Sequence, residues 1–377
     1  MTADLTSRID LLFPSRISFG TGAAAEVGRW AASRGLKRPL VVADAFNVPR
    51  IASLGFSGEV ACCSDFPPEP DAAALERLLA EVRRADPDLV VGFGGGSAMD
   101  LAKLAAVLPG SGQDFTAVVG AEKVATRRTA LAQVPTTSGT GSEVGTRALV
   151  TDPATLNKLA VQSVHMLADF AAVDPELMAS MPRAVTVSTG VDALAHCVEC
   201  YTNKHAHPLI DLYVEEGIRL AGRFLPRAAS DRADREAQAG MALAALYGGF
   251  GLGPVNTAAG HAVAYPLGTH HHIAHGAANA LIFPHVLAFN APAVPERTAG
   301  VLRALGLTVS SEPKAVFAAA YKWCVDLGCK MRLSDYGVPE ADLPAMAREA
   351  HANRRLLDNN PRDLSVQDIL AIYRSAY

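Results

Sequence analysis

Four glycines stand within five positions at the start of GFGGGSAMDLAK, residues 92–103, which passes from an apolar run into a helical pattern. Glycines let a backbone approach another group closely, and the start of a helix offers free N–H groups and a positive dipole end. The segment therefore predicts a phosphate-binding loop. It is neither common type, since the dinucleotide fingerprint has glycine where Ser97 stands and the P-loop has Lys-Ser or Lys-Thr directly after its last glycine. A tight strand-to-helix turn without a ligand is the alternative.

The surroundings of this loop alternate between β-rich and helical patterns. The apolar, β-branched runs at 38–44 (RPLVVAD) and 87–93 (PDLVVGF) are typical of buried parallel strands. Between them, residues 70–85 carry apolar side chains at helical spacing, with Asp71 in position to cap the helix. Strands that alternate with helices predict a doubly wound, Rossmann-like α/β domain built on a parallel sheet.

Two more segments extend this pattern before it changes. LAQVPTT, 131–137, predicts another strand, and residues 146–162 predict a hairpin around the turn signal Asp152-Pro153. Further along the chain the strand patterns give way to helical ones. We therefore expect two domains, an α/β nucleotide-binding domain over 1–182 and an all-helical metal- and substrate-binding domain over 183–377.

Length and composition limit the class of protein. The 377 residues, half of them hydrophobic and 19% charged, suffice for two domains with large buried cores. No apolar run predicts a transmembrane helix, and the N-terminal segment lacks the features of an export signal. The net charge of −4, without any Lys/Arg-rich run, argues against nucleic-acid and membrane partners. Six cysteines in so long a chain do not make a disulfide framework, so we expect a reducing cytoplasm.

Asp44 ends the strand pattern at 38–44. A carboxylate at such a strand end can accept the hydrogen bonds of both adenosine ribose hydroxyls, and it repels the 2′-phosphate of NADP. We therefore expect Asp44 at the ribose of a bound NAD, with NAD preferred to NADP.

The helical half holds two groups of residues that suit a metal. Asp192 and His196 stand four residues apart in a helical stretch, so both side chains leave the same face. Further on, residues 260–285 hold six of the chain's eleven histidines. A lone histidine is usually a packed or surface residue, but two spaced groups, one with a carboxylate, favour a metal site.

The second group is expected to form a helix, a loop and a helix. Pro266 should end the first helix with His261 on it, residues 268–272 should form the loop, and His275 should begin the next helix. This arrangement can aim both imidazoles at one point. Together with the carboxylate and imidazole of the first group they make a ligand set suited to zinc or iron.

Other reactive residues are weaker candidates. The pair Cys197 and Cys200 has no second pair and no redox context, so both are expected in the core, and Cys62 and Cys63 are expected to fill a strand. The run His270, His271 and His272 is expected to line a pocket near the metal site. No G-x-S-x-G elbow is present.

Four motifs, in this order, resemble those of the iron-containing (group III) alcohol dehydrogenases, and the likeness covers nearly the whole chain. They are GGGSAMDLAK (94–103), VPTTSGTGSEV (134–144), VDALAHCVECYTN (191–203) and HAVAYPLG…HGAANALIFPH (261–285). The resemblance implies the dehydroquinate synthase-like architecture, an α/β domain and an all-helical metal domain with a cleft between them. It also implies NAD-linked interconversion of an alcohol and its aldehyde or ketone, with Fe²⁺ or Zn²⁺ polarising the substrate oxygen, in a homodimer or larger homo-oligomer.

The resemblance also assigns roles to matching positions. The pyrophosphate loop is implied at Gly94, Gly95, Gly96 and Ser97, with Asp100 one helical turn further on. The nicotinamide end is implied at Thr136, Thr137 and Ser142. The implied metal ligands are Asp192, His196, His261 and His275.

The candidate catalytic residues are Lys158, Tyr265 and His271. Lys158 resembles a lysine that the family keeps facing the cleft. Many members carry a histidine where Tyr265 stands, whereas some relatives that act on hydroxyacids, such as the hydroxyacid–oxoacid transhydrogenases, have tyrosine there. We expect Tyr265 to shape the pocket, and donation of a proton is the alternative.

Two rival functions share this architecture. One is a non-redox lyase like the dehydroquinate synthases, which use NAD transiently, and the other is a metal-free reductase like the maleylacetate reductases. The latter do not keep all the ligand positions, whereas all four are present here. The sequence leaves the substrate open among alcohols, diols and hydroxyacids.

Overall fold

The computed structural model describes residues 5–153 and 158–377, so the tip of the hairpin predicted over 146–162 lies outside the described residues. The chain separates into two compact units. The first comprises Leu12–Thr137 and Gly141–Ser180, and the second comprises Met181–Tyr377 together with Ser138–Thr140 and the chain up to Leu11. Relative to the expected division after residue 182, the helical unit thus takes two short segments from the first part of the chain.

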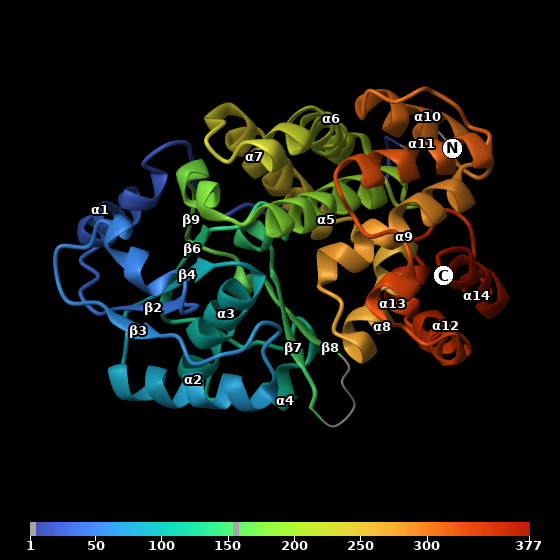
Figure 1. The fold of residues 1–377 in the computed structure, drawn as a ribbon. Coiled ribbons are helices and arrows are strands. Elements are labelled where there is room, and N and C mark those ends of the chain that lie inside the picture. Colours follow the sequence, from blue (N-terminus) through green and yellow to red (C-terminus); the bar gives the residue numbers. More distant parts are fainter. Residues whose placement is uncertain (1–4, 154–157) are drawn as a thin grey trace. The chain divides into compact units, whose positions relative to one another are not determined.

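A six-stranded parallel sheet forms the centre of the first unit (Figure 1). Residues of β2 alternate between two cores, with Leu40 and Val42 on one face and Val41 and Ala43 on the other. Because both faces are covered, the strands are continuous apolar runs. This confirms the predicted fold class. In spatial order the strands are β1 (Arg16–Phe19), β9 (Phe170–Val173), β6 (Ala130–Pro135), β4 (Leu89–Gly94), β2 (Pro39–Ala43) and β3 (Ala61–Cys63).

Helices cover both faces of this sheet. Helix α1 (Glu26–Ser33) packs on one face, and α2 (Ala72–Ala85), α3 (Gly96–Ser111) and α4 (Phe115–Val118) pack on the other. The side chain of Asp71 caps α2, as predicted, by accepting a hydrogen bond from the backbone N–H of Ala74 at 2.8 Å.

The predicted hairpin belongs to a second, smaller sheet. Its strands are β5 (Gly120–Ala121), β8 (Lys158–Gln162) and β7 (Arg147–Thr151), in that order. Strands β7 and β8 are antiparallel, and Thr151 pairs with Lys158 at the end towards the turn.

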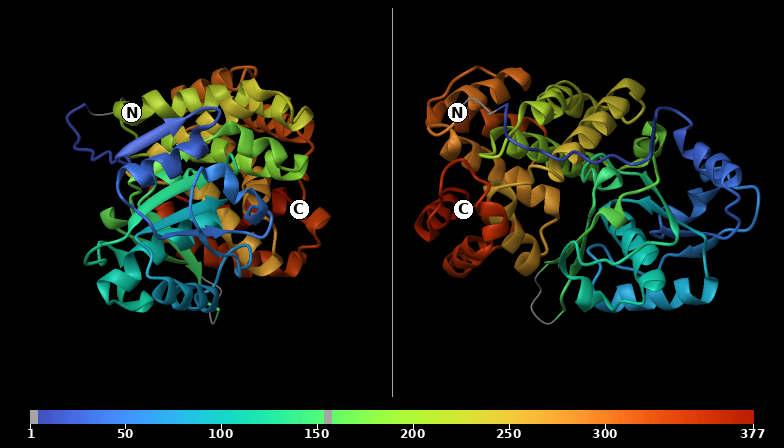
Figure 2. Two further views of the ribbon diagram at one scale, coloured as in Figure 1. Left: turned by 90° about the vertical axis from the view of Figure 1, so that its left-hand side faces the viewer. Right: turned by 180° about the vertical axis from the view of Figure 1, so that it is seen from behind.

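The second unit is built from helices around two apolar cores. Helices α5, α6, α7, α9 and α11 enclose one core, while α8, α9, α12 and α14 enclose the other. Figure 2 shows α6 and α7 running side by side. The helices are α5 (Arg183–Thr202), α6 (Pro208–Ser230), α7 (Arg235–Leu252), α8 (Ala259–His271), α9 (His275–Asn290), α10 (Pro295–Ala304), α11 (Pro313–Asp326), α12 (Leu343–Ala352), α13 (Arg354–Leu357) and α14 (Val366–Ser375).

The expectation that Pro266 ends a helix is wrong. Helix α8 continues through Pro266 to His271, so residues 268–271 are helical, and only His272 leaves the helix, with a left-handed φ of 53°. An internal proline removes one helical hydrogen bond and costs about 3 kcal/mol. Burial of apolar side chains on both sides of the proline offsets this cost, and the buried phenol of Tyr373 donates to the carbonyl of Val263 at 2.6 Å.

Candidate active site

The glycine loop lies where the strand order of the parallel sheet reverses. From β2 the chain passes to β3 on one side and then returns to β4 on the other side of β2. Open α/β sheets bind their ligands at this switch point, outside the carboxyl ends of the strands. Gly94 ends β4 there, and Gly95 is the N-cap of α3, whose first N–H groups have no acceptor within the helix.

Asp44 lies directly at this loop. A Cβ atom on Gly94 would stand 2.8 Å from the Cβ of Ala98 and 3.1 Å from Asp44 Oδ2, so only glycine fits closely there. Asp44 Oδ1 accepts from the N–H groups of Phe46 and Asn47 at 3.0 and 3.1 Å, and Oδ2 accepts from Asn47 Nδ2 at 2.8 Å. The structure thus brings the expected ribose ligand and the expected phosphate loop together.

Two threonines after β6 border the same loop. The N–H of Thr136 donates to the carbonyl of Gly94 at 3.0 Å, and its hydroxyl accepts from Asn47 Nδ2 at 3.2 Å. A Cβ on Gly95 would lie 3.6 Å from the side chain of Thr137. Both threonines therefore stand beside the loop that the motifs assign to the cofactor.

Asp100 and Ser142 are engaged in a network inside the first unit. Ser142 Oγ donates to Asp100 Oδ1 at 2.6 Å, and the N–H of Leu149 donates to Asp100 Oδ2 at 3.0 Å. Lys103, fully buried on α3, donates to Ser142 Oγ at 2.6 Å and to the carbonyl of Arg147 at 2.7 Å. These bonds tie α3 to β7, so both residues hold the loop's supporting helix in place.

Lys158 forms an ion pair at the start of β8. Its Nζ lies 2.8 Å from Glu69 Oε2 and donates to Thr151 Oγ1, also at 2.8 Å. The N–H of Glu69 in turn donates to the hydroxyl of Ser97 at 3.2 Å. The lysine is thereby linked through one acidic residue to the glycine loop.

Three of the four expected metal ligands, Asp192, His261 and His275, have ligand atoms within 4.8 Å of one another in the second unit, and His196 stands beside them. Asp192 and His196 lie on α5, His261 lies in the first turn of α8, and His275 begins α9. Asp192 Oδ1 lies 3.5 Å from Nε2 of His261, 3.5 Å from Nε2 of His275 and 3.8 Å from Nε2 of His196. The ring of His196 stacks on that of His261 with centroids 4.7 Å apart.

Glycines next to two of these histidines allow close helix packing. Gly276 follows His275, and a Cβ there would lie 2.0 Å from the carbonyl oxygen of Ser188 on α5. Gly260 precedes His261, and a Cβ there would lie 2.6 Å from Oε1 of Glu199, also on α5. Helices α8 and α9 can therefore approach α5 closely enough for their imidazoles to meet Asp192.

The hydrogen bonds of the imidazoles fit a metal ion. His196 Nδ1 lies 3.3 Å from the carbonyl of Gly139, and His261 Nδ1 lies 2.5 Å from Glu199 Oε1. Both partners only accept, so each Nδ1 must donate, and the Nε2 atoms that face Asp192 can offer lone pairs. One carboxylate oxygen and imidazole nitrogens are donors that zinc and ferrous iron bind. The residues present fit the metal that the motifs imply.

Burial and mutual attraction set the charges of this cluster. Burial opposes ionisation of Asp192, but His196, His275 and His261 together hold the pKa of its carboxyl below the usual value. Burial lowers the pKa of His196 to about 4. Against the same effect of burial, Glu199 and Asp192 raise the pKa of His261 well above its ordinary value. The cluster thus pairs an ionised carboxylate with a His261 ring that holds a proton, and a cation that binds there would take the place of this proton.

Two buried residues of this site were missed by the sequence analysis. Glu199 contacts His261, and Asn279 Nδ2 donates to Asp192 Oδ1 at 2.8 Å while lying 3.2 Å from Nε2 of His261 and 3.3 Å from Nε2 of His275. The signal was helical spacing, because Glu199 follows Asp192 by seven residues and Asn279 follows His275 by four.

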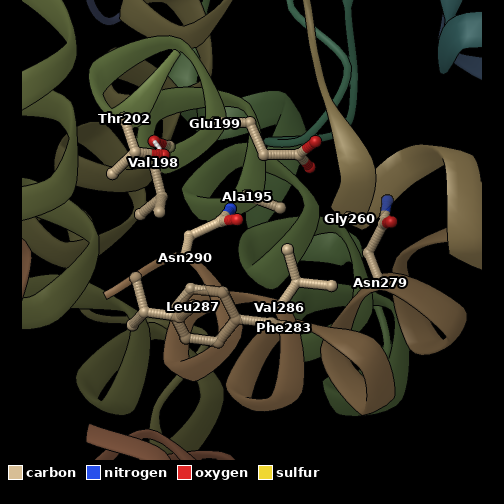
Figure 3. Close-up of a pocket in the computed structure, with 10 residues that line it drawn as sticks. All are labelled: Ala195, Val198, Glu199, Thr202, Gly260, Asn279, Phe283, Val286, Leu287 and Asn290. Atoms are coloured by element: carbon tan, nitrogen blue, oxygen red, sulfur yellow. Dashed lines mark hydrogen bonds between the residues drawn. The ribbon is translucent and has the colours of Figure 1, made fainter. Parts of the chain in front are cut away.

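A small cavity of about 20 Å³ lies behind the cluster, enough for a water molecule. Figure 3 shows the carboxylate of Glu199 and the amide of Asn279 on one side of it and the apolar side chains of Phe283 and Leu287 on another. Gly260 also lines this cavity. Polar side chains beside the proposed ligands and apolar side chains of α9 therefore line one cavity.

Tyr265 stands beside the cluster. One helical turn after His261, its ring centroid lies 6.4 Å from that of His261 and 5.7 Å from that of His275. The histidines that follow on α8 turn elsewhere. The Nε2 of His271 lies 3.6 Å from Asp342 Oδ2, and His270 bonds to Glu349. The expected pocket loop is thus the last turn of α8, because the helix continues beyond its proline.

The remaining candidates match their expected structural roles. Cys197 and Cys200 are buried, Cys62 and Cys63 lie in β3, and each of the six cysteines is a free thiol. Among the residues that the structure describes, no helix is both long and apolar enough to cross a membrane.

Comparisons with known proteins agree with this geometry. Residues 14–175 match the model of "Iron-containing alcohol dehydrogenase", and residues 186–377 match "Fe-containing alcohol dehydrogenase family, C-terminal". Long-chain-alcohol dehydrogenase 1 of Geobacillus thermodenitrificans is 35% identical over 97% of this chain and 96% of its own length. The structure of a 1,3-propanediol oxidoreductase superposes with a TM-score of 0.93 at 32% identity, covering 98% of this chain and 100% of that one. The structure of a sulfoacetaldehyde reductase from Bifidobacterium kashiwanohense, in complex with NAD⁺, has a TM-score of 0.89 at 28% identity and covers 98% and 99% of the two chains.

The sheet with its glycine loop and the helical unit with its carboxylate–imidazole cluster define a metal-dependent alcohol oxidoreductase. The chain belongs to the iron-containing alcohol dehydrogenase family, as its motifs predict. Neither of the two rival functions is favoured by these matches.

Proposed function

We propose that this protein is an NAD(H)-linked alcohol dehydrogenase whose divalent metal, Fe²⁺ in the first place, is held by Asp192, His196, His261 and His275. One observation carries the proposal: the carboxylate oxygen of Asp192 lies 3.5–3.8 Å from the Nε2 atoms of all three histidines. Such spacing suits donors that share one small cation.

The chemistry follows from these groups. When bound, the metal supplies a Lewis acid that polarises the substrate oxygen and lowers the pKa of the alcohol. The alcohol would lose a hydride to bound NAD⁺ and a proton to solvent, which gives the aldehyde or ketone and NADH. Tyr265, beside His261 and His275, shapes the pocket around the reacting carbon and can hydrogen-bond a substrate oxygen.

The cofactor is assigned to the switch point of the parallel sheet. Gly94, Gly95, Gly96 and Ser97 receive the pyrophosphate, Asp44 receives the ribose, and Thr136 and Thr137 border the nicotinamide end. The contact of Asp44 with the glycine loop supports this assignment, as does the NAD⁺ complex of the related sulfoacetaldehyde reductase. Asp100 and Ser142 support α3 from inside, and Lys158 is a polar residue of the same unit that we assign to the catalytic step.

The proposed substrate is a small-molecule alcohol, diol or hydroxyacid. The relatives named for long-chain alcohols and 1,3-propanediol support alcohols and diols. Six free thiols support a reducing compartment, the cytoplasm. Exposed Leu12 and Phe13, which precede edge strand β1, and exposed Phe19 at its end support a homodimer or larger homo-oligomer, which light scattering of the purified protein tests.

Metal content and NADH formation test the function together. The protein is purified with Fe²⁺ or Zn²⁺, and alcohols, diols and hydroxyacids are screened by NADH absorbance. His261→Ala should lose metal and activity, and the matched variant His270→Ala on the same helix should keep both, because His270 bonds to Glu349 instead of the cluster. Full metal content and activity in His261→Ala would contradict the proposed ligand set. Lack of NADH formation with every substrate and both metals would contradict the proposed reaction.

A further inference from the structure

The carboxylate of Glu199 is buried beside the proposed metal ligands, where it accepts several hydrogen bonds. Glu199 lies on α5 and is 7% exposed. Its Oε1 accepts from His261 Nδ1 at 2.5 Å, and its Oε2 accepts from the N–H groups of Ala258 at 2.6 Å and His261 at 3.3 Å. One carboxylate therefore holds both the ring of His261 and the backbone that carries it.

This contact decides which nitrogen of His261 can bind a metal. A carboxylate accepts hydrogen bonds only, so Nδ1 must carry a hydrogen towards Glu199. In the neutral ring the lone pair is then on Nε2, which lies 3.5 Å from Asp192 Oδ1. With the hydrogen on Nε2 instead, the ring could not bind a metal at that side.

The Nδ1 atoms of His261 and His196 have different hydrogen-bond acceptors. The Nδ1 of His196 meets the neutral backbone carbonyl of Gly139, at the longer distance of 3.3 Å. A charged acceptor makes a stronger hydrogen bond than a neutral one and raises the basicity of the ring as a ligand. The chain also reserves space for this carboxylate, since any side chain on Gly260 would overlap it.

We propose that Glu199 is a positioning residue that fixes His261 in the Nδ1–H tautomer and thereby sets the metal affinity of the site. The inference rests on the proposed ligand set and adds to it a residue that does not touch the metal. Glu199 acts through His261 and the first turn of α8, since the hydrogen bonds of its carboxylate go to His261 and to the backbone at the start of that helix.

Glu199→Gln tests the tautomer directly. A glutamine has one accepting and one donating end, so it cannot accept at both positions that Glu199 fills. If its oxygen accepts from the backbone, its amide donates to Nδ1 and moves the hydrogen of His261 to Nε2. The dissociation constants of Zn²⁺ and Co²⁺, from competition with a chelator, should rise about 10–100-fold. The visible spectrum of the Co²⁺ form should change, whereas a purely structural role would leave it as in the native protein.

A second variant perturbs the same contact without removing the charge. Gly260→Ala keeps Glu199 but places a methyl group 2.6 Å from Oε1, and it should also weaken metal binding about tenfold or more. Alanine favours helix, so loss of α8 does not explain such a result. Thr202→Val is the matched control, because Thr202 lines the same cavity but donates to the carbonyl of Val198. It should bind metal as the native protein does.

The outcomes separate this inference from the proposed function. If the native protein binds metal, His261→Ala loses it, and Glu199→Gln binds with native affinity and an unchanged Co²⁺ spectrum, the positioning role is overturned and the ligand set stands. If Glu199→Gln does not fold, Gly260→Ala with native affinity overturns the role as well. If the native protein binds no metal, or His261→Ala binds it normally, the ligand set fails and the role fails with it.

Discussion

Replacing Glu143 by glutamine should stabilise the α/β unit at neutral and alkaline pH, and much less at acid pH. Glu143 lies in the short turn Ser142–Val144 and is 2% exposed. Burial raises the pKa of its carboxyl to about 7, against the opposite effects of a backbone hydrogen bond and of Lys103. Lys103 keeps Asp100, 3.6 Å away, as a charge partner in the variant.

The sign and size of the effect follow from this pKa. A carboxyl group whose pKa rises on folding, here from 4.5 to about 7, binds its proton more tightly in the folded chain. The stability from this proton is fully present below the unfolded pKa and is lost as the pH rises through the folded one. At about 1.4 kcal/mol per pH unit, the loss between roughly pH 5 and pH 8 is about 2.5 kcal/mol. Glutamine carries no such proton, so its contribution does not vary with pH.

The two tryptophans of the chain allow each unit to be followed separately. Trp30 lies on α1 in the first unit, and Trp323 lies on α11 in the second. In a Trp323→Phe background, Trp30 fluorescence during urea unfolding reports the α/β unit alone. The gain in free energy of unfolding from Glu143→Gln should grow by about 2.5 kcal/mol between roughly pH 5 and pH 8. Glu59→Gln, at an exposed carboxyl of the same unit, should show no such trend. If the free energy of unfolding varied with pH in the same way with and without Glu143→Gln, the reasoning would be refuted.

Four further substitutions have defined outcomes. Tyr265→Phe should keep kcat within a few-fold in steady-state assays if the ring shapes the pocket, whereas a fall of about 100-fold or more with metal and NAD still bound would indicate a proton relay. Asp44→Gly should narrow the preference for NAD over NADP in kcat/KM, and equal native values for the two cofactors would contradict the ribose role. Asn279→Leu removes the donor to Asp192 and should weaken metal binding about tenfold in a chelator competition. Native metal affinity in this variant would show that the hydrogen bond from Asn279 does not support the site. Tyr373→Phe removes a buried hydrogen bond to α8 and should lower the free energy of unfolding by about 1–2 kcal/mol, and an unchanged urea midpoint would show that the bond contributes nothing.

The strands of the sheet could be predicted from the sequence because the pattern that identifies each of them lies within the strand itself. Strands buried on both faces must be apolar throughout, so 38–44 and 87–93 could be identified without knowledge of their partners. The continuation of α8 through Pro266 could not, because it depends on packing against helices far away in the chain. Prolines also lie inside α3, α6 and α9, so this architecture repeatedly overrides the local rule through tertiary contacts.

At the site, the types and spacing of the residues allowed a prediction from the sequence, whereas the partners of their hydrogen bonds could not be predicted. A carboxylate and three imidazoles at regular spacing in an apolar context predicted Asp192, His196, His261 and His275, and the structure brings them together. The cofactor motif also placed Asp100 at the nucleotide. In the structure its carboxylate bonds inside the unit, to β7 and the turn before it, and no local pattern indicates such a long-range partner.

Metal affinity and helix packing are closely connected in this chain. Helix α5 carries two of the proposed ligands and Glu199, and α8 and α9, which carry the other two, each place a glycine at the contact with α5. A bulkier residue at Gly276 would meet the backbone of α5, and one at Gly260 would meet the carboxylate of Glu199, so either would disturb the site while every proposed ligand remains in the sequence. Because coordination depends on positions within a few tenths of an ångström, whereas helix cores tolerate larger shifts, the metal should respond to such changes before the fold does. The glycines beside the histidines therefore belong to the site as much as its ligands do, although neither glycine has a side chain to offer.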